Sequence, residues 1–476
     1  MVSRTTTLSR PARTADGLEA LFRAIRAEHE VPETFPADVL AAAEAAARAP
    51  DLPDRDERDI PFVTIDPPGA MDLDQALHLG RTPDGFRVRY AIADVAAFVA
   101  PGGPVDAEAH RRGQTIYCPD TRVPLHPPAL SEGAASLLPG EDRPAYVWDI
   151  TLDADGSRRA ATVYRAMVRS RARHTYEEVQ AAADDGTGGE VVELLRAVGR
   201  LRIARESARG GASLPMPEQE VVADDAGRYA LRRRPVLAAE EWNAQISLLT
   251  GIAAAALMLD GGVGILRTMP PAAPEAVARL RHEARALGAE WPKGLAYGDF
   301  LRGLDRSDPK HLAIIHEATA LFRGSGYRAF DGAAPEDRVQ AAIAAPYAHT
   351  TAPLRRLVDR YSLAVCAALA GGGEPPAWVR DGLAELPGIM AETGRRASAV
   401  DRACTDAVEA AVLAHRVGEE FAAVVVDAAR GGVEIQVTEP AVTARAEGTA
   451  QPGDTVRARL TEADPATGTV RFTLRP

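Results

Sequence analysis

The sequence predicts an α+β protein that ends in a small β-barrel. Short β-type runs, separated by glycine, proline and aspartate, fill residues 60–153, whereas helical patterns dominate from residue 176 to about 370. A run of strands followed by a run of helices is typical of an α+β fold rather than of alternating βαβ units. From about residue 418 the pattern returns to short strands, which predicts a barrel of the OB type.

Each element follows from its local pattern. An N-terminal helical arm is expected over residues 1–50, because residues 15–29 carry apolar side chains at helical spacing and residues 37–49 are rich in alanine. The charged link DLPDRDERD starts the central domain, residues 51–415, and the barrel takes residues 416–476. We expect strands at 61–66, 86–95, 145–153, 421–427, 432–438, 442–449, 454–463 and 467–476, and helices at 174–183, 190–208, 238–259, 274–288 and 354–370.

Composition limits the class of protein but not its substrate. The 476 residues are 46% hydrophobic and 26% charged, as in ordinary globular proteins. A net charge of −12 gives no overall attraction for nucleic acid, so a polyanion would need a local basic groove or a metal-loaded cleft. Cys118, Cys366 and Cys404 are too scattered to predict disulfides or a zinc site, which favours a reducing cytoplasm. We expect no signal peptide, and the apolar stretch 248–259 is too short to span a membrane.

The segment VTIDPPGAMDLDQAL carries the chemistry that first points to a function. Asp66 ends a predicted strand, and a Pro-Pro-Gly loop leads to Asp72 and Asp74. Three crowded carboxylates repel one another unless a cation neutralises them, and oxygen ligands select Mg²⁺ or Mn²⁺. Two such ions can hydrolyse a phosphodiester. Spacing alone leaves a second interpretation open, which is a solvated acidic turn after a strand.

The surrounding sequence resembles the ribonuclease II family, the RNB domain. The resemblance lies in the IADV segment, in IYCPD, in PLHPPALSEGAASLLPGEDRP and, farther on, in HTYEEVQ, AAEEW and YAHTTAPLRRLVD, and it is nearly unbroken over residues 59–153. It implies an RNB catalytic domain, a mixed sheet with helices, followed by an OB-type barrel. It also implies a 3′-to-5′ exoribonuclease that hydrolyses single-stranded RNA to nucleoside 5′-monophosphates with Mg²⁺, Mn²⁺ being possible.

The resemblance assigns roles to the aspartate cluster. Asp66, Asp72 and Asp74 match three of the family's four active-site aspartates, and Asp74 matches the one most directly tied to cleavage. The fourth position is Gln75, whose carbonyl oxygen can still bind a metal but whose charge is lost. The implied metal ligands are thus Asp66, Asp72, Asp74 and Gln75, with Asp72 and Asp74 also catalytic. One metal ion or two remains open.

Further residues are implied to bind RNA. Arg355 matches an arginine directed at the scissile phosphate, and Pro353 is expected to start a helix whose N-terminus faces that phosphate. Arg356 is also predicted to bind RNA; the alternative is an arginine on the exposed surface of a helix. Tyr117 matches a tyrosine that stacks on a base, with a buried core tyrosine as the alternative.

Two acidic residues complete the predicted RNA site. Glu241, beside Glu240, is implied to sense ribose hydroxyls, although Ser247 stands where the family usually has asparagine. Asp401 in AVDRA is a candidate contact near the RNA 3′ end.

Two functions stay open. The family commonly has two cold-shock-type domains before its core, where this chain has room only for the helical arm, and Phe421 and Phe472 are the sole aromatic residues expected in the barrel. With Gln75, these departures support an alternative, which is a catalytically weakened RNA-binding or regulatory protein. Retention of Asp66, Asp72, Asp74, Tyr117 and Arg355 favours the enzyme. Single-stranded RNA is the expected partner, with no membrane and no obligate protein partner.

Overall fold

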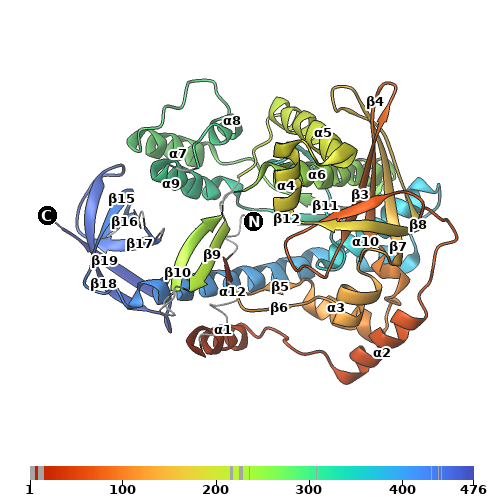
Figure 1. Cartoon of the computed structure of the whole chain (residues 1–476), viewed down its shortest axis with the longest axis horizontal. Helices are drawn as coiled ribbons and strands as arrows, with labels where there is room; N and C mark the ends of the chain where they lie inside the picture. The colour runs from red at the N-terminus through yellow and green to blue at the C-terminus, as the bar shows by residue number, and fades with distance from the viewer. Residues whose placement is uncertain are drawn as a thin grey trace.

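The computed structural model describes residues 6–8, 16–214, 218–223, 229–234, 236–306, 308–429, 431–437, 439–440 and 442–475. The two closed barrels lie on opposite sides of the molecule in Figure 1, and helices occupy the space between them. The α+β class predicted from the sequence is confirmed, as is the final barrel.

The first barrel is built from a mixed sheet, as predicted. Its strands follow the order β2-β3-β4-β7-β8, and the parallel pairing of β2 with β8 closes the sheet, which the sequence pattern did not reveal. Long hairpins hold the other neighbours antiparallel. The bounds are β2 (Phe62–Ile65), β3 (Gln75–Thr82), β4 (Gly85–Ala93), β7 (Asp142–Asp153) and β8 (Arg158–His174).

Helices pack against this barrel and form the main apolar core with it. The helix α5 lies against β3, α10 lies against β8, and α6 contacts both helices. The predicted helices are present, as α4 (Tyr176–Asp185), α5 (Gly189–Ala208), α6 (Ala238–Asp260), α7 (Pro274–Ala286) and α10 (Leu357–Ala370). Only the last differs notably, since it starts three residues later than the predicted residue 354.

The helix α6 has an apolar composition. It is the one helix in the described part of the chain that is long and apolar enough to cross a membrane. Most of its apolar window, 61%, is buried inside the protein, and its buried side chains belong to the main core. This is the behaviour of a core helix.

The N-terminal arm contains both predicted helices, α1 (Asp16–Glu28) and α2 (Ala37–Arg48); residues 1–5 and 9–15 of the predicted arm lie outside the described residues. The helix α1 packs against α12, and α2 packs against α3. Arg26 of α1 is almost completely buried and forms ion pairs with Glu33 and with Asp120, which lies in the turn between β5 and β6. The arm is therefore attached to the hairpin that carries Tyr117.

The remaining elements connect these parts. They are β1 (Thr6–Leu8), α3 (Pro104–Arg112), β5 (Ile116–Tyr117), β6 (Arg122–Val123), β9 (Glu218–Ala223), β10 (Tyr229–Arg234), β11 (Val263–Thr268), α8 (Tyr297–Arg302), α9 (Pro309–Glu317), β12 (Gly326–Asp331), β13 (Val339–Gln340), β14 (Ala345–Pro346), α11 (Ala377–Gly382) and α12 (Leu386–Ala414), with short helical turns at Val95–Ala97, Leu130–Ala134 and Ala318–Phe322. The long helix α12 extends from the central domain to the second barrel.

The C-terminal barrel has the five strands that the sequence predicts, in the order β15-β16-β17-β19-β18. Its two aromatic side chains, Phe421 and Phe472, are buried and meet edge to face inside it. They stabilise the barrel core and present no stacking surface to solvent. The bounds are β15 (Glu420–Ala429), β16 (Gly432–Val437), β17 (Thr443–Glu447), β18 (Thr455–Asp464) and β19 (Thr469–Leu474).

Candidate active site

Asp66 and Asp74 lie at the same end of the first barrel. Asp66 directly follows β2, and Asp74 directly precedes β3, its antiparallel neighbour. Asp74 is buried and held from the other side of the site: Leu354 N–H donates to its Oδ1 at 2.8 Å, and Arg355 Nη1 lies 3.2 Å from its Oδ2. Asp74, at the start of β3, is thus in contact with a turn that lies almost 300 residues later in the sequence.

The two carboxyl groups are poorly compensated for their burial. Loss of hydration raises the pKa of Asp66 to about 6 and that of Asp74 to about 7, although the Arg355 charge lowers both values. The charge of Asp72 raises both further. In each group Oδ2 is buried and accepts no hydrogen bond, although that of Asp74 lies 3.2 Å from Arg355 Nη1. A buried oxygen that lacks a donor and carries charge is a place where a cation would be stabilising.

The other two predicted metal ligands are engaged by the protein. Asp72 Oδ1 accepts from Arg122 Nη1 at 2.7 Å, and the other amino group of Arg122 lies 2.9 Å from Glu132. Gln75 Oε1 accepts from the Tyr90 hydroxyl, and its Nε2 donates to the carbonyl oxygen of Thr351. Within the described residues, no three His, Cys, Asp or Glu side chains are close enough to share one ion. The residues therefore fit a cation at Asp66 and Asp74 whose remaining ligands come from water or substrate.

The expectation for Pro353 is wrong, because α10 begins only at Leu357. Ala352 accepts backbone hydrogen bonds from Arg355 and Arg356, and this turn, not a helix N-terminus, presents Arg355 to Asp74. The Arg355 side chain is 36% exposed, so its guanidinium can reach a bound molecule.

Arg356 behaves differently from its neighbour. Its Nε and Nη2 donate to both carboxylate oxygens of Asp359, each at 2.7 Å, and Asp359 is fully buried. Asp359 also accepts from Ala352 N–H, so this pair fixes the turn that carries Arg355. The alternative of a surface helix arginine is therefore wrong. The RNA-binding role of Arg356 stays a prediction, and its guanidinium is already occupied.

Tyr117 lies on β5 and is 49% exposed, so the alternative of a buried core tyrosine is wrong. Loss of hydration around its hydroxyl raises the pKa of Tyr117 to about 12, and the charges that act on it are those of Arg355, Asp72, Asp74 and Arg122. An exposed ring beside the carboxylates is suitably placed to stack on a base.

The acidic RNA-binding candidates are placed less directly. Glu241 pairs with Arg306 at 3.0 Å, whereas Glu240 pairs with Arg234 and its charge reaches Tyr176. Asp401 lies on α12, a helix that packs against β5. The RNA-binding roles of Glu241 and Asp401 stay predictions.

Sequence reasoning missed three residues around the cluster. Arg122 holds Asp72, while Tyr176 accepts a hydrogen bond from Asn243 and lies within the electrostatic range of Asp66 and Arg355. Arg122 stands five residues after Tyr117 in the sequence, and the structure pairs the two residues across β5 and β6. Tyr176 lies in the HTYEEVQ segment and Asn243 directly follows AAEEW, but the fold is what brings α4 and α6 to the site.

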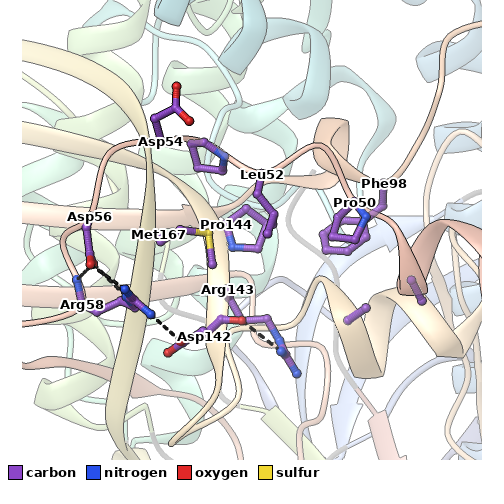
Figure 2. A pocket seen from close by; sticks show the side chains of 13 residues that line it. Pro50, Leu52, Asp54, Asp56, Arg58, Phe98, Asp142, Arg143, Pro144 and Met167 are labelled. Atoms are coloured by element: carbon purple, nitrogen blue, oxygen red, sulfur yellow. Dashed lines mark hydrogen bonds and ion pairs between the residues drawn. The ribbon is translucent and has the colours of Figure 1, made fainter.

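The two described pockets do not include the carboxylate cluster. One of about 480 Å³ lies where the link after α2 crosses the first barrel, and Figure 2 shows its polar wall. There Arg58 pairs with Asp56 and with Asp142. The second, of about 550 Å³, lies between β7, β8 and the end of α10. Because Arg58 already pairs with two of the acidic side chains there, we assign this pocket to packing of the link.

Comparison with known proteins identifies both domains. Residues 54–369 match the RNB domain, and residues 419–475 match the RNase II-type exonuclease C-terminal S1 domain. Ribonuclease R of Thermotoga maritima is 28% identical over 87% of this chain and 62% of its own length. Ribonuclease R of Escherichia coli is 30% identical over 70% of this chain and 42% of its own. The chain thus spans less than two thirds of these relatives.

Solved structures show the same fold. Mycoplasma genitalium RNase R in complex with ribose-methylated single-stranded RNA has a TM-score of 0.84 at 19% identity, over 97% of this chain and 78% of that one. Yeast Ssd1, described as a pseudonuclease, has a TM-score of 0.69 at 14% identity, over 93% of this chain and 57% of that one. With the RNB match covering most of the sequence, the chain belongs to the ribonuclease II family of RNB-domain exoribonucleases.

Proposed function

We propose that the chain is a metal-dependent 3′-to-5′ exoribonuclease that hydrolyses single-stranded RNA to nucleoside 5′-monophosphates in the cytoplasm. The single observation that carries the proposal is the pair formed by the half-buried Asp66 and the buried Asp74, each with a buried Oδ2 that accepts no hydrogen bond. Poorly compensated carboxylates cost stability, so they are kept where a cation and a substrate use them. Family membership supports RNA as the substrate, and the Mycoplasma relative was solved with RNA.

The chain's own residues have distinct tasks in this proposal. A divalent cation, when bound, supplies a Lewis acid and a water of lowered pKa. Arg355 places a guanidinium beside Asp74, where it can bind phosphate oxygens and stabilise the charge that develops on them. Tyr117 offers its exposed ring to a base, and Arg122 holds Asp72 in a fixed orientation.

The test uses 5′-labelled single-stranded RNA. The purified protein should shorten it progressively with Mg²⁺ or Mn²⁺, and EDTA or Asp74→Asn should stop the shortening. Asp427→Asn, in the C-terminal barrel, is a matched carboxylate control that should leave the ladder of products unchanged. RNA that stays intact under every condition would overturn the proposal, and equal cleavage of DNA would overturn its specificity for RNA.

A second function is favoured by one specific observation. The amide of Gln75 stands where the family has an aspartate, and a pseudonuclease is among the proteins that share the fold. In that case the chain would bind RNA without cleaving it. Tight binding of labelled RNA by the wild-type protein, with no products in Mg²⁺ or Mn²⁺, would favour this function over the first.

A further inference from the structure

Both polar atoms of the Gln75 side chain are hydrogen-bonded to other parts of the protein. Its Oε1 accepts from the Tyr90 hydroxyl at 2.6 Å, and its Nε2 donates to Thr351 O at 2.6 Å. Tyr90 is buried on the neighbouring strand β4, where Gln75 pairs with Ile92 and Tyr90 pairs with Leu77. The amide thus bridges the inside of the barrel and a distant loop.

The chain of hydrogen bonds continues to α6 and has a fixed direction. Tyr90 has a single hydroxyl proton, which it donates to Gln75. Ser247 Oγ, 2.8 Å from the Tyr90 oxygen, must therefore be the donor in that contact. Gln75 and Ser247 are both positions at which this sequence departs from the family pattern, and Tyr90 connects them.

At Thr351 this series of hydrogen bonds reaches the turn that carries Arg355. Thr351, whose carbonyl oxygen accepts from Gln75, is followed within four residues by Leu354, which donates to Asp74, and by Arg355, which pairs with it. Gln75 directly follows Asp74 in the sequence. Its amide therefore ties the two halves of the site together immediately beside the buried carboxylate.

An aspartate at position 75 could not make these contacts. A carboxylate has no N–H to donate to Thr351 O, and the aspartate side chain is one methylene shorter. Facing a carbonyl oxygen, it would add a negative charge with no donor on that side, near Asp74, whose own pKa is already raised by burial. The glutamine amide avoids this unsatisfied charge, because its oxygen accepts from Tyr90 and its nitrogen donates to Thr351.

We infer that Gln75 is a positioning residue and not a metal ligand, that Ser247 and Tyr90 orient it, and that the site binds one divalent cation per chain through Asp66 and Asp74. The inference rests on the proposed function for its substrate, but its metal stoichiometry concerns the protein alone. Where the family has a negatively charged aspartate, the Gln75 amide holds the turn of Arg355 close to Asp74 through its hydrogen bond to Thr351.

The experiment measures Mn²⁺ binding by electron paramagnetic resonance on the full chain without RNA, and then cleavage kinetics. Gln75→Met keeps the length of the side chain but removes both hydrogen bonds. Gln180→Met is the matched control, since the Gln180 amide also bonds two protein groups, Ala239 N–H and Asp184, outside the site. Circular dichroism and thermal unfolding verify that each variant folds. A third variant, Ser247→Ala, removes the hydrogen bond between the partly exposed Ser247 and Tyr90.

We expect one Mn²⁺ per wild-type chain and a dissociation constant that changes less than about threefold in Gln75→Met. The value of kcat should fall about tenfold with little change in KM, because the turn that carries Arg355 loses one of its attachments, and Ser247→Ala should give a smaller fall in the same direction. Gln180→Met should change neither constant. Two ions per wild-type chain, or a more than tenfold loss of Mn²⁺ affinity in Gln75→Met, would overturn the inference while leaving the proposed function intact. No Mn²⁺ binding together with no cleavage would overturn both.

Discussion

The two barrels of this chain share a closed five-stranded architecture but differ in what they bury. The C-terminal barrel encloses an apolar core, in which Phe421, Ile435 and Leu460 pack together. The first barrel has an apolar core too, but at one end it keeps Asp66 and Asp74, each with one buried oxygen that accepts no hydrogen bond, and Tyr90 forms hydrogen bonds there. A closed barrel with an apolar core is therefore sufficient for stability, as in the C-terminal barrel. We expect the functional site in the first barrel, where the carboxylates are poorly compensated.

The largest effect should come from the buried charge itself. Asp74→Asn keeps the size of the side chain and an acceptor for Leu354 N–H but removes the charge beside Arg355. We expect RNA cleavage to fall by at least about 10³-fold, which corresponds to about 4 kcal/mol of barrier. Single-turnover rates with labelled RNA provide the measurement. A loss below tenfold would mean that the first barrel is not the catalytic one.

Arg355 and Arg356 offer an adjacent pair with opposite roles. Arg355→Ala should lower kcat by about 10²–10³-fold with little loss of stability, because its partly exposed guanidinium acts on substrate. Arg356→Ala should instead destabilise the fold by about 3–5 kcal/mol, because Asp359 would remain buried and unpaired. Urea unfolding and kinetics on both variants separate the roles. The reverse pattern would show that the two arginines have been assigned the wrong way round.

A smaller effect is expected at the exposed ring. Tyr117→Ala should weaken binding of single-stranded RNA by about 1–3 kcal/mol, roughly 5- to 150-fold, since it removes one stacked base. Tyr117→Phe keeps the ring and is the control that should bind like the wild type. Fluorescence anisotropy with Asp74→Asn as the background prevents cleavage during the titration. Equal loss in both variants would point to the hydroxyl and not to stacking.

The least effect on catalysis should come from the core of the second barrel. Leu460→Ala removes a fully buried side chain and should cost about 2–5 kcal/mol of stability. Below the unfolding transition, kcat on a short oligonucleotide should equal that of the wild type. A matching fall in kcat would show that the C-terminal barrel takes part in the chemistry.

The sequence predicted the regular elements well because their patterns are local. The five strands of the second barrel and the helices α4 to α7 follow from alternation and helical periodicity over a few residues. Barrel closure by β2 and β8 was not visible, since a parallel pairing across about 100 residues leaves no local trace. The same holds for the site. Asp66 and Asp74 were found from their motif, but the bond from Gln75 to Thr351 and the contacts of Leu354 and Arg355 with Asp74 arise only when residues near 350 fold onto the barrel.

The most direct test of the central claim, that Asp66 and Asp74 are kept charged for a cation, is thermal unfolding of the wild type and Asp74→Asn with EDTA or Mg²⁺ at pH 5 and pH 8. A raised carboxyl pKa means that stability is fully present below the unfolded value near 4 and is lost as pH rises through about 6 and 7. In EDTA at pH 8 the variant should therefore melt above the wild type, and at pH 5 this advantage should shrink. Mg²⁺ should raise the Tm of the wild type at pH 8 and affect the variant little. A variant that melts below the wild type in EDTA at pH 8, with no response of either protein to Mg²⁺, would contradict the account.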